Sequence, residues 1–242
     1  MKILIVNDDG FDAVALPHII RWARTLGDVT CVVPKREQSG KSQAIDYLHP
    51  VEITEVSVAE DIRVWAMDST PADCVRFATS GLGTSYDLIL SGINRGYNLG
   101  DDIAYSGTVG AINEGGRLGI TSIALSCDPQ GLPEALGMLD HWWGFMKDKG
   151  LLKKGSLYNV NFPLLPSPKG IRITRQGGQF YSDAFEYRGD NMYMQVGAPV
   201  PRGEVDLTID MDAVLNGYIS ITPMAWKRMD PIAFDAIKDI SL

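Results

Sequence analysis

Two adjacent carboxylates, Asp8 and Asp9, are the residues of this chain best suited to chemistry. They follow a short apolar run, residues 2–7, that is rich in branched side chains and is closed by Gly10. This pattern is typical of a strand buried on both faces of a parallel sheet, and open α/β sheets bind ligands at the carboxyl ends of such strands. Because neighbouring carboxylates repel each other, a hard cation such as Mg²⁺ or Mn²⁺ suits the pair. An ordinary Asp-Asp-Gly turn is the alternative interpretation.

A second polar region, residues 91–110, follows a later apolar run and precedes a helical pattern. Its glycines allow close backbone approach to a ligand. Asn94 comes soon after the apolar run, where its amide oxygen is available to a metal. Residues 106–108, Ser-Gly-Thr, stand at the expected helix start, where free N–H groups and the helix dipole favour an anion. A long surface loop with an ordinary Ser/Thr cap remains the alternative.

A third candidate, Ser39, lies in the loop after the expected second strand. The loop ends in Gly40-Lys41-Ser42 and nearly matches a phosphate-binding P-loop, but Lys35 stands where that motif needs its first glycine. An NTPase is therefore disfavoured. The Ser39 hydroxyl is instead a candidate neutral metal ligand, with an ordinary polar loop serine as the alternative.

Together these positions resemble the parts of a metal-assisted phosphate hydrolase. Two carboxylates balance one divalent cation, neutral oxygens complete its shell, and the helix start binds the phosphate. We expect a metal-activated water as the nucleophile. A covalent aspartyl phosphatase needs an acid where Gly10 stands. The candidate metal ligands are Asp8, Asp9, Ser39 and Asn94; the candidate catalytic residues are Asp8, Asp9, Asn94 and Ser106; the candidate phosphate contacts are Ser39, Gly40, Asn98, Ser106, Gly107 and Thr108.

Strand and helix patterns alternate along the first two thirds of the chain, which predicts a doubly wound, mostly parallel, Rossmann-like α/β sheet. Thr70-Pro71 is a strong helix start, with Thr as the N-cap and Pro at the first helical position. The expected strands are residues 2–7, 29–33, 51–57, 62–67, 87–90 and 121–125, and the expected helices are residues 15–26, from 70 onward, 108–118 and 132–149.

The pattern becomes richer in strands after about residue 155. Expected strands are residues 157–161, 171–174, 191–196, 205–209 and 217–221. We therefore expect residues 1–155 to form the catalytic core and residues 156–242 to be a β-rich extension that completes the same domain. Residues 175–200 hold glycines and aromatics with little periodicity, and we expect them to pair with themselves or with another subunit.

The composition of the chain limits the kinds of partner that we expect it to bind. The 242 residues carry a net charge of −8 and no run of Lys and Arg, which argues against a nucleic-acid polymer as partner. Three scattered cysteines, Cys31, Cys74 and Cys127, indicate reduced core thiols and a cytoplasmic protein. The apolar runs fall short of the roughly 20 residues that span a bilayer, and the amino terminus does not read as a signal segment, so no membrane association is expected.

The ordered set of motifs resembles the SurE family of 5′-nucleotidases over most of residues 1–127. The resemblance rests on residues 6–10 (VNDDG), 39–40 (SG), 69–75 (STPADCV), 91–94 (SGIN) and 105–109 (YSGTV). It implies hydrolysis of nucleoside 5′-monophosphates, with 3′-monophosphates as further candidates. It also implies one divalent cation per subunit, Mg²⁺ or Mn²⁺, held by Asp8, Asp9, Ser39 and Asn94. Homodimers or tetramers with exchanged carboxyl-terminal segments are a further implication.

Two stretches depart from the family pattern. Residues 13–17 replace an Ala-Pro-Gly-like stretch, and residues 40–46 replace a Gly-His or Gly-Ser followed by Ile-Thr. Both lie near the expected mouth of the site, so they bear on substrate preference. A receiver-type signalling module, which also places paired acids after its first strand, is the remaining alternative. It would be about half this length and would need a Lys after the strand at 121–125, where Ser126-Cys127-Asp128-Pro129 stands.

Overall fold

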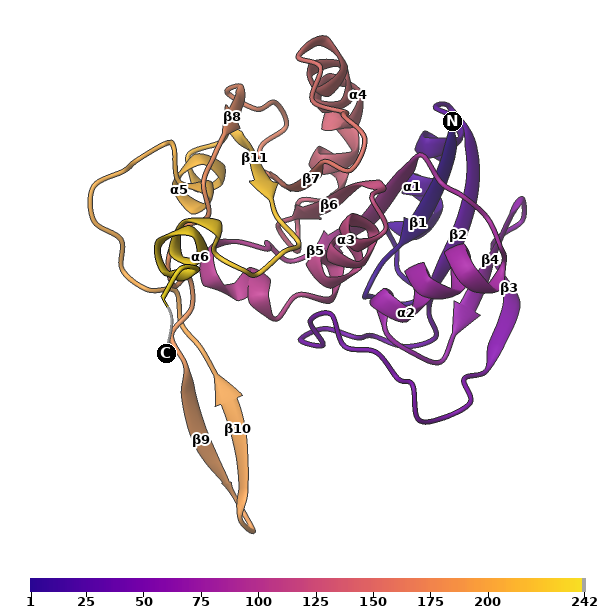
Figure 1. Cartoon of the computed structure of the whole chain (residues 1–242), viewed down its shortest axis with the longest axis horizontal. Helices are drawn as coiled ribbons and strands as arrows, with labels where there is room; N and C mark the ends of the chain where they lie inside the picture. Colours follow the sequence, from indigo (N-terminus) through magenta and orange to yellow (C-terminus); the bar gives the residue numbers. More distant parts are fainter. Residues whose placement is uncertain (241–242) are drawn as a thin grey trace.

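Nine strands form one mixed sheet in the order β3-β4-β2-β1-β5-β6-β7-β11-β8 in the computed structural model, which describes residues 1–240 (Figure 1). The strands of this sheet are β1 (Lys2–Val6), β2 (Asp28–Pro34), β3 (Ile53–Ala59), β4 (Ile62–Met67), β5 (Leu88–Arg95), β6 (Thr121–Cys127), β7 (Leu157–Phe162), β8 (Ile171–Ile173) and β11 (Ile219–Met224).

The central strands are parallel and their carboxyl ends meet at one edge. β1 pairs with β2 on one side and with β5 on the other, with Val6 opposite Ser91. β5, β6 and β7 continue the parallel run, whereas β3 pairs antiparallel with β4 and β11 with β7. The chain winds away from β1 in both directions, which makes the carboxyl ends of β1 and β5 the topological switch point where such sheets bind ligands.

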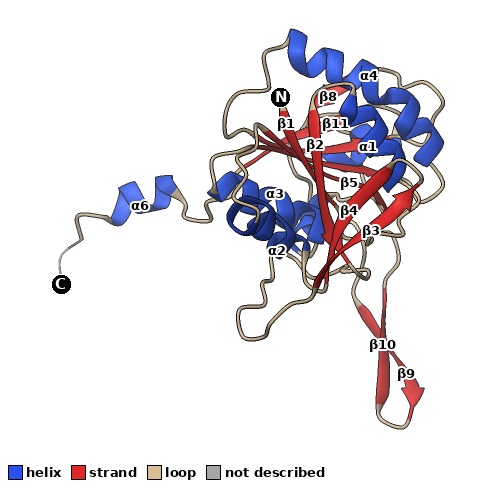
Figure 2. Cartoon of the chain, turned by 90° about the vertical axis from the view of Figure 1, so that its right-hand side faces the viewer, coloured by secondary structure: helices blue, strands red, loops and turns tan. Residues whose placement is uncertain are grey.

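Helices cover both faces of the sheet (Figure 2). Ile3 and Ile5 of β1 pack with α1 and α4 on one face, whereas Leu4 and Val6 pack with α2 and α3 on the other. This alternation is the two-residue period of a strand with two buried faces. The helices are α1 (Leu16–Arg24), α2 (Pro71–Arg76), α3 (Gly107–Arg117), α4 (Leu132–Asp148), α5 (Asp210–Leu215) and α6 (Pro231–Ile237), with short π and 3₁₀ turns at Phe77–Gly81 and Gly100–Ala104.

Two carboxyl-terminal elements stand away from the main body. β9 (Ala184–Gly189) and β10 (Met192–Val196) form a two-stranded antiparallel hairpin that projects from it (Figures 1 and 2). Helix α6 also extends outward (Figure 2). Large apolar side chains are exposed on both: Phe185, Tyr187, Met192, Tyr193 and Met194 on the hairpin, and Ile232, Phe234 and Ile237 on α6.

The predicted fold class is confirmed, as are a helix capped by Thr70 with Pro71 at its start and three buried, free cysteines in the described residues. The strand predicted over residues 205–209 is wrong. Asp206 Oδ1 accepts hydrogen bonds from the backbone N–H and the hydroxyl of Thr208, and this local turn replaces sheet pairing except for a bridge at Ile209. Within the predicted segment 175–200, residues 184–189 and 192–196 pair with each other as the hairpin. Helices α5 and α6 were not predicted.

Among residues 1–240, no helix combines the length and the apolar character needed to cross a membrane.

Candidate active site

A tight turn after β1 fixes the two acids. The side-chain amide of Asn7 donates to the carbonyl oxygen of Gly10 at 2.8 Å, and the N–H of Gly10 donates back to Asn7 Oδ1 at 3.2 Å. Gly10 has a φ of +99°, a backbone conformation that favours glycine. The Asp-Asp-Gly sequence forms a turn, and this turn holds Asp8 and Asp9 at the edge of the sheet, where the metal site is predicted.

Asp8 joins the end of β1 to the start of α3. Its side chain accepts the backbone N–H of Thr108 at 3.1 Å and the Thr108 hydroxyl at 2.6 Å, and the residue is only 3% exposed. A Cβ on Gly107 would lie 2.9 Å from Asp8 Cβ, so glycine is needed there for this close approach. Burial raises the pKa of the Asp8 carboxyl, against the hydrogen bonds from Thr108 that lower it.

Asp9 is strongly perturbed beside it. Burial, followed by the charges of Asp8 and Glu37, raises the pKa of Asp9 to about 6, while the backbone N–H and the charge of Arg95 oppose this rise. Asp9 Oδ2 is buried and has no hydrogen-bond partner within residues 1–240. A desolvated carboxylate oxygen without a partner is costly, and a bound cation relieves that cost.

The loop after β2 brings Ser39 to the same edge. The N–H of Gln38 donates to the backbone carbonyl oxygen of Asp8 at 2.7 Å. The Ser39 side chain is exposed, and its hydroxyl donates to Glu37 Oε1 at 2.8 Å. Glu37 is a third acid at the site, since its charge also acts on Asp8 and Asp9. Sequence reasoning missed Glu37, because no motif distinguishes it from the other charged residues of the loop.

Asn94 lies at the end of β5, which is longer than predicted because its pairing with β6 resumes at Asn94 opposite Ser126. Its side-chain amide donates to the carbonyl oxygen of Gly96 at 2.8 Å. Its side-chain carbonyl oxygen accepts no hydrogen bond within residues 1–240 and is available to a ligand.

At the start of α3, some hydrogen-bond donors are free within the described residues and others already have partners in the protein. Ser106 is the N-cap, and its hydroxyl oxygen accepts the N–H of Val109 at 3.1 Å. Thr108 is committed to Asp8, whereas the N–H of Gly107, the first helical residue, has no partner within the helix. The helix start is therefore a candidate anion site, whose donors would be mainly the N–H of Gly107 and the helix dipole.

Asn98 does not join this group of side chains. It is a buried residue of the loop that follows β5. Its side-chain amide donates to Ser126 Oγ at 2.8 Å and its backbone N–H donates to Asn161 Oδ1 at 3.0 Å. Its backbone carbonyl oxygen accepts from the side-chain amides of Asn159 and Asn161. These contacts give Asn98 a role in anchoring the loop to β6 and β7.

A distant carboxylate completes the support of this loop. Asp210, the fully buried first residue of α5, accepts the N–H of Gly100 at Oδ2 and that of Gly177 at Oδ1, both at 2.9 Å. Burial raises the pKa of the Asp210 carboxyl, and these N–H groups oppose that rise. Nothing in the sequence pattern pointed to this residue.

The residues at the carboxyl edge fit a divalent cation of the hard, oxygen-binding kind. Within residues 1–240, no three His, Cys, Asp or Glu side chains are arranged as a metal cluster. A cation would thus depend on the Asp8 and Asp9 carboxylates together with neutral oxygens such as those of Ser39 and Asn94. The partnerless, buried Asp9 Oδ2 is the feature that best matches this requirement.

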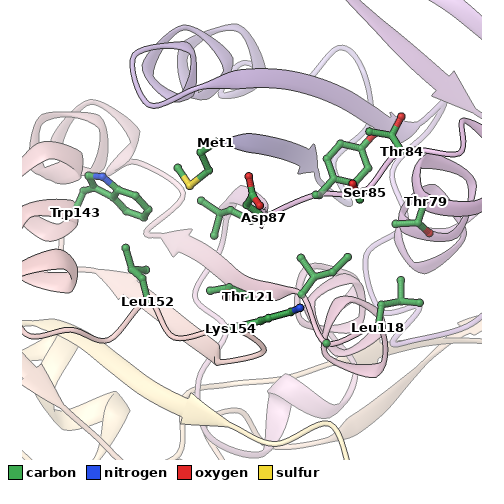
Figure 3. Close-up of a pocket in the computed structure, with 14 residues that line it drawn as sticks. Met1, Thr79, Thr84, Ser85, Asp87, Leu118, Thr121, Trp143, Leu152 and Lys154 are labelled. Carbon is green, nitrogen blue, oxygen red and sulfur yellow. The ribbon is translucent and has the colours of Figure 1, made fainter.

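A cavity of about 650 Å³ lies at the opposite edge of the sheet, near the amino ends of β1, β5 and β6 (Figure 3). Asp87 and Lys154 bring charges to its wall, and Leu118, Trp143 and Leu152 bring apolar surface (Figure 3). None of the candidate site residues lines it.

A doubly wound sheet with paired carboxylates and a helix start at its switch point defines the class of α/β proteins that bind ligands in a crevice beyond their strand ends. The family profile described as "Survival protein SurE" matches residues 3–183. The chain belongs to the SurE family.

Named relatives and a solved structure are similar to this chain over nearly its whole length. The "5′-nucleotidase SurE" of Paramagnetospirillum magneticum is 40% identical, with 93% of this chain and 90% of that protein covered. The "5′-nucleotidase SurE" of Syntrophomonas wolfei is 36% identical, with 95% and 90% covered. The crystal structure of the SurE protein from Aquifex aeolicus matches with a TM-score of 0.81 and 32% identity, covering 98% of both chains.

Proposed function

We propose that this protein is a 5′-nucleotidase, a phosphomonoesterase that hydrolyses nucleoside 5′-monophosphates with the help of one divalent cation. The observation that carries the proposal is the Asp8–Thr108 contact, which joins a carboxylate pair to an anion-binding helix start. Relatives named 5′-nucleotidase SurE, at 36% to 40% identity, support the same reaction.

Each residue has a distinct role in this proposal. Asp8 and Asp9, with the oxygens of Ser39 and Asn94, hold the cation, and Thr108 orients the Asp8 carboxylate. When bound, the cation supplies Lewis acidity and lowers the pKa of a water molecule. Asp9 also receives the proton of the attacking water, because its pKa, raised to about 6, lies close to neutral pH.

The phosphate group of the substrate binds at the start of α3. The N–H of Gly107 and the positive end of the helix dipole meet its oxygens, and the Ser106 hydroxyl caps the first turn by accepting the N–H of Val109. Ser39 and Gly40 border the phosphate from the loop after β2. Since Thr108 is bound to Asp8, it contributes by positioning that carboxylate more than by donating to the substrate.

Phosphate release from a panel of nucleoside 5′- and 3′-monophosphates tests the proposal. We expect EDTA to abolish turnover and added Mg²⁺ or Mn²⁺ to restore it, because the available ligands are oxygens. Full activity after exhaustive removal of metal would overturn the metal-dependent reaction. Phosphate release from none of the nucleotides, with either cation present, would overturn the assignment as a nucleotidase.

We also propose a homodimer or tetramer built on the projecting elements. Residues 1–155 form the catalytic core and residues 156–242 complete the same domain, since β7 and β11 lie in one sheet with β1. The exposed Phe185, Tyr187 and Tyr193 of the hairpin form an apolar surface of the kind that marks an interaction site. Replacing residues 183–197 with a short Gly-Ser linker is expected to lower the mass measured by light scattering, and an unchanged mass would contradict this assembly.

The proposed location is the cytoplasm, because Cys31, Cys74 and Cys127 are buried free thiols in the described residues. Recovery of the protein in the cell-envelope fraction would contradict it.

A further inference from the structure

The loop of residues 38–46, which carries Ser39, is held by contacts along its whole length. At its start, the N–H of Gln38 donates to the Asp8 carbonyl oxygen at 2.7 Å. In its middle, the N–H of Ser42 donates to the Tyr105 carbonyl oxygen at 2.9 Å, and its hydroxyl to that of Ala104 at 2.8 Å. A Cβ on Gly110 would lie 2.1 Å from the Ser42 carbonyl oxygen, so the loop lies directly on α3.

Further along the loop, Gln43 contacts a carboxylate of α3, Glu114, which is 2% exposed. Glu114 Oε2 accepts the side-chain amide of Gln43 at 3.1 Å. Its other oxygen accepts from Arg76 at 3.2 Å and from Arg117 at 2.7 and 2.9 Å. Burial by itself would raise the pKa of Glu114, but the hydrogen bonds from Arg117 and Gln43 and the charges of Arg117 and Arg76 hold it below its usual value.

A second buried carboxylate, Asp73 of α2, accepts a hydrogen bond from the end of the loop. Asp73 Oδ2 accepts the backbone N–H of Asp46 at 2.8 Å and the hydroxyl of Ser69 at 2.6 Å. The hydroxyl of Thr70 donates to the Ala44 carbonyl oxygen at 2.6 Å. The Ser-Thr-Pro-Ala-Asp stretch at residues 69–73 therefore contacts the loop instead of the crevice, which gives this motif a use that the proposed reaction does not.

These carboxylates are costly to bury, and none of the hydrogen bonds that they accept comes from a candidate site residue. Carboxyl groups at such positions require several compensating donors, and the loop supplies one to each: the Gln43 side chain to Glu114 and the Asp46 backbone to Asp73. Without these donors, the segment between Gln38 and Asp46 would be held only through Ser42 and Ala44.

We propose that Glu114 is a positioning residue that holds the loop of residues 38–46 against α3, and thereby keeps Ser39 at the cation site and sets the affinity of that site for a divalent cation. The proposal rests on the proposed function, since it assumes that Ser39 contributes to that site. It extends the site to an acid outside the candidate metal ligands and phosphate contacts.

The test replaces Gln43, the loop residue that donates to Glu114, so that both buried acids and their arginines stay intact. We expect Gln43→Met to weaken Mn²⁺ binding about tenfold, the usual scale for partners that orient metal ligands. Mn²⁺ binding to substrate-free protein is measured from the electron paramagnetic resonance signal of the free ion. Gln43→Lys, which keeps a donor for Glu114, is expected to bind Mn²⁺ nearly as well as the wild type. Gln130→Met, on an exposed loop, is the matched control.

A second readout separates positioning from general loss of structure. Turnover of Gln43→Met is expected to fall at limiting Mn²⁺ and to recover at saturating Mn²⁺, with a melting temperature close to that of Gln130→Met. Wild-type Mn²⁺ affinity in Gln43→Met, or a loss of affinity that Gln43→Lys shares, would overturn the positioning role while leaving the nucleotidase proposal in place. Absence of Mn²⁺ binding in the wild type would overturn both.

Discussion

The two edges of the central sheet differ in an instructive way. The amino edge has a cavity of about 650 Å³ whose walls mix apolar and polar side chains, whereas the carboxyl edge gathers Asp8, Asp9, Asn94 and the start of α3. Parallel strands deliver their loops and the positive ends of the following helices to the carboxyl edge alone. The convergence of polar groups, and not the volume of empty space, is therefore the basis on which we propose the carboxyl edge as the active site.

The largest effect that separates the two edges is expected from a matched pair of Asp variants. Asp8→Ala is expected to lower kcat/KM by more than about 100-fold, beyond the scale of an outer partner of a metal site, because it removes a proposed direct ligand of the cation. Asp87→Ala, which changes an acid at the amino edge, is expected to keep wild-type kcat/KM. Phosphate release and thermal unfolding are measured on both variants.

Wild-type turnover in Asp8→Ala, or an equal loss of kcat/KM in Asp87→Ala, would contradict the proposed difference between the two edges. A folded but inactive Asp8→Ala protein is required, and circular dichroism checks this directly.

A smaller effect is expected from a matched pair of Thr variants. Thr108→Val removes the hydroxyl that donates to Asp8 at 2.6 Å and is expected to lower kcat/KM about tenfold, since the carboxylate loses an orienting partner. Thr121→Val removes a hydroxyl that donates to the Lys153 carbonyl oxygen at the amino edge, and it is expected to leave kcat/KM unchanged. Equal losses in the two variants would show that the measured effect is general destabilisation and not the geometry of the site.

Local signals predicted the parts of the site that depend on neighbouring residues. The apolar run before Asp8 and the Thr70-Pro71 start of α2 are short-range patterns, and the structure has both. The Ser106 cap of α3 is likewise local, and its hydroxyl accepts the N–H of Val109. These features are fixed within a few residues of sequence, so the chain itself specifies them.

The features that escaped prediction depend on tertiary contacts. The extension of β5 to Arg95 requires β6 beside it, and the role of Glu114 requires the loop of residues 38–46 to lie on α3. Asn98 was predicted to contact phosphate, but its partners come from β6 and β7. In residues 205–209, alternation suggested a strand, yet Asp206 formed a local turn. Tertiary partners and side-chain turns override periodicity in these places.

The bond from Gly100 to Asp210 spans 110 positions of the chain. During synthesis, the residues around Asp8 leave the ribosome first, yet the loop that borders them lacks its carboxylate anchor until α5 has been made. A contact of such long range carries a high loop-closure cost, so we expect this anchor of the loop to form late in folding, after the neighbouring strands of the sheet have paired.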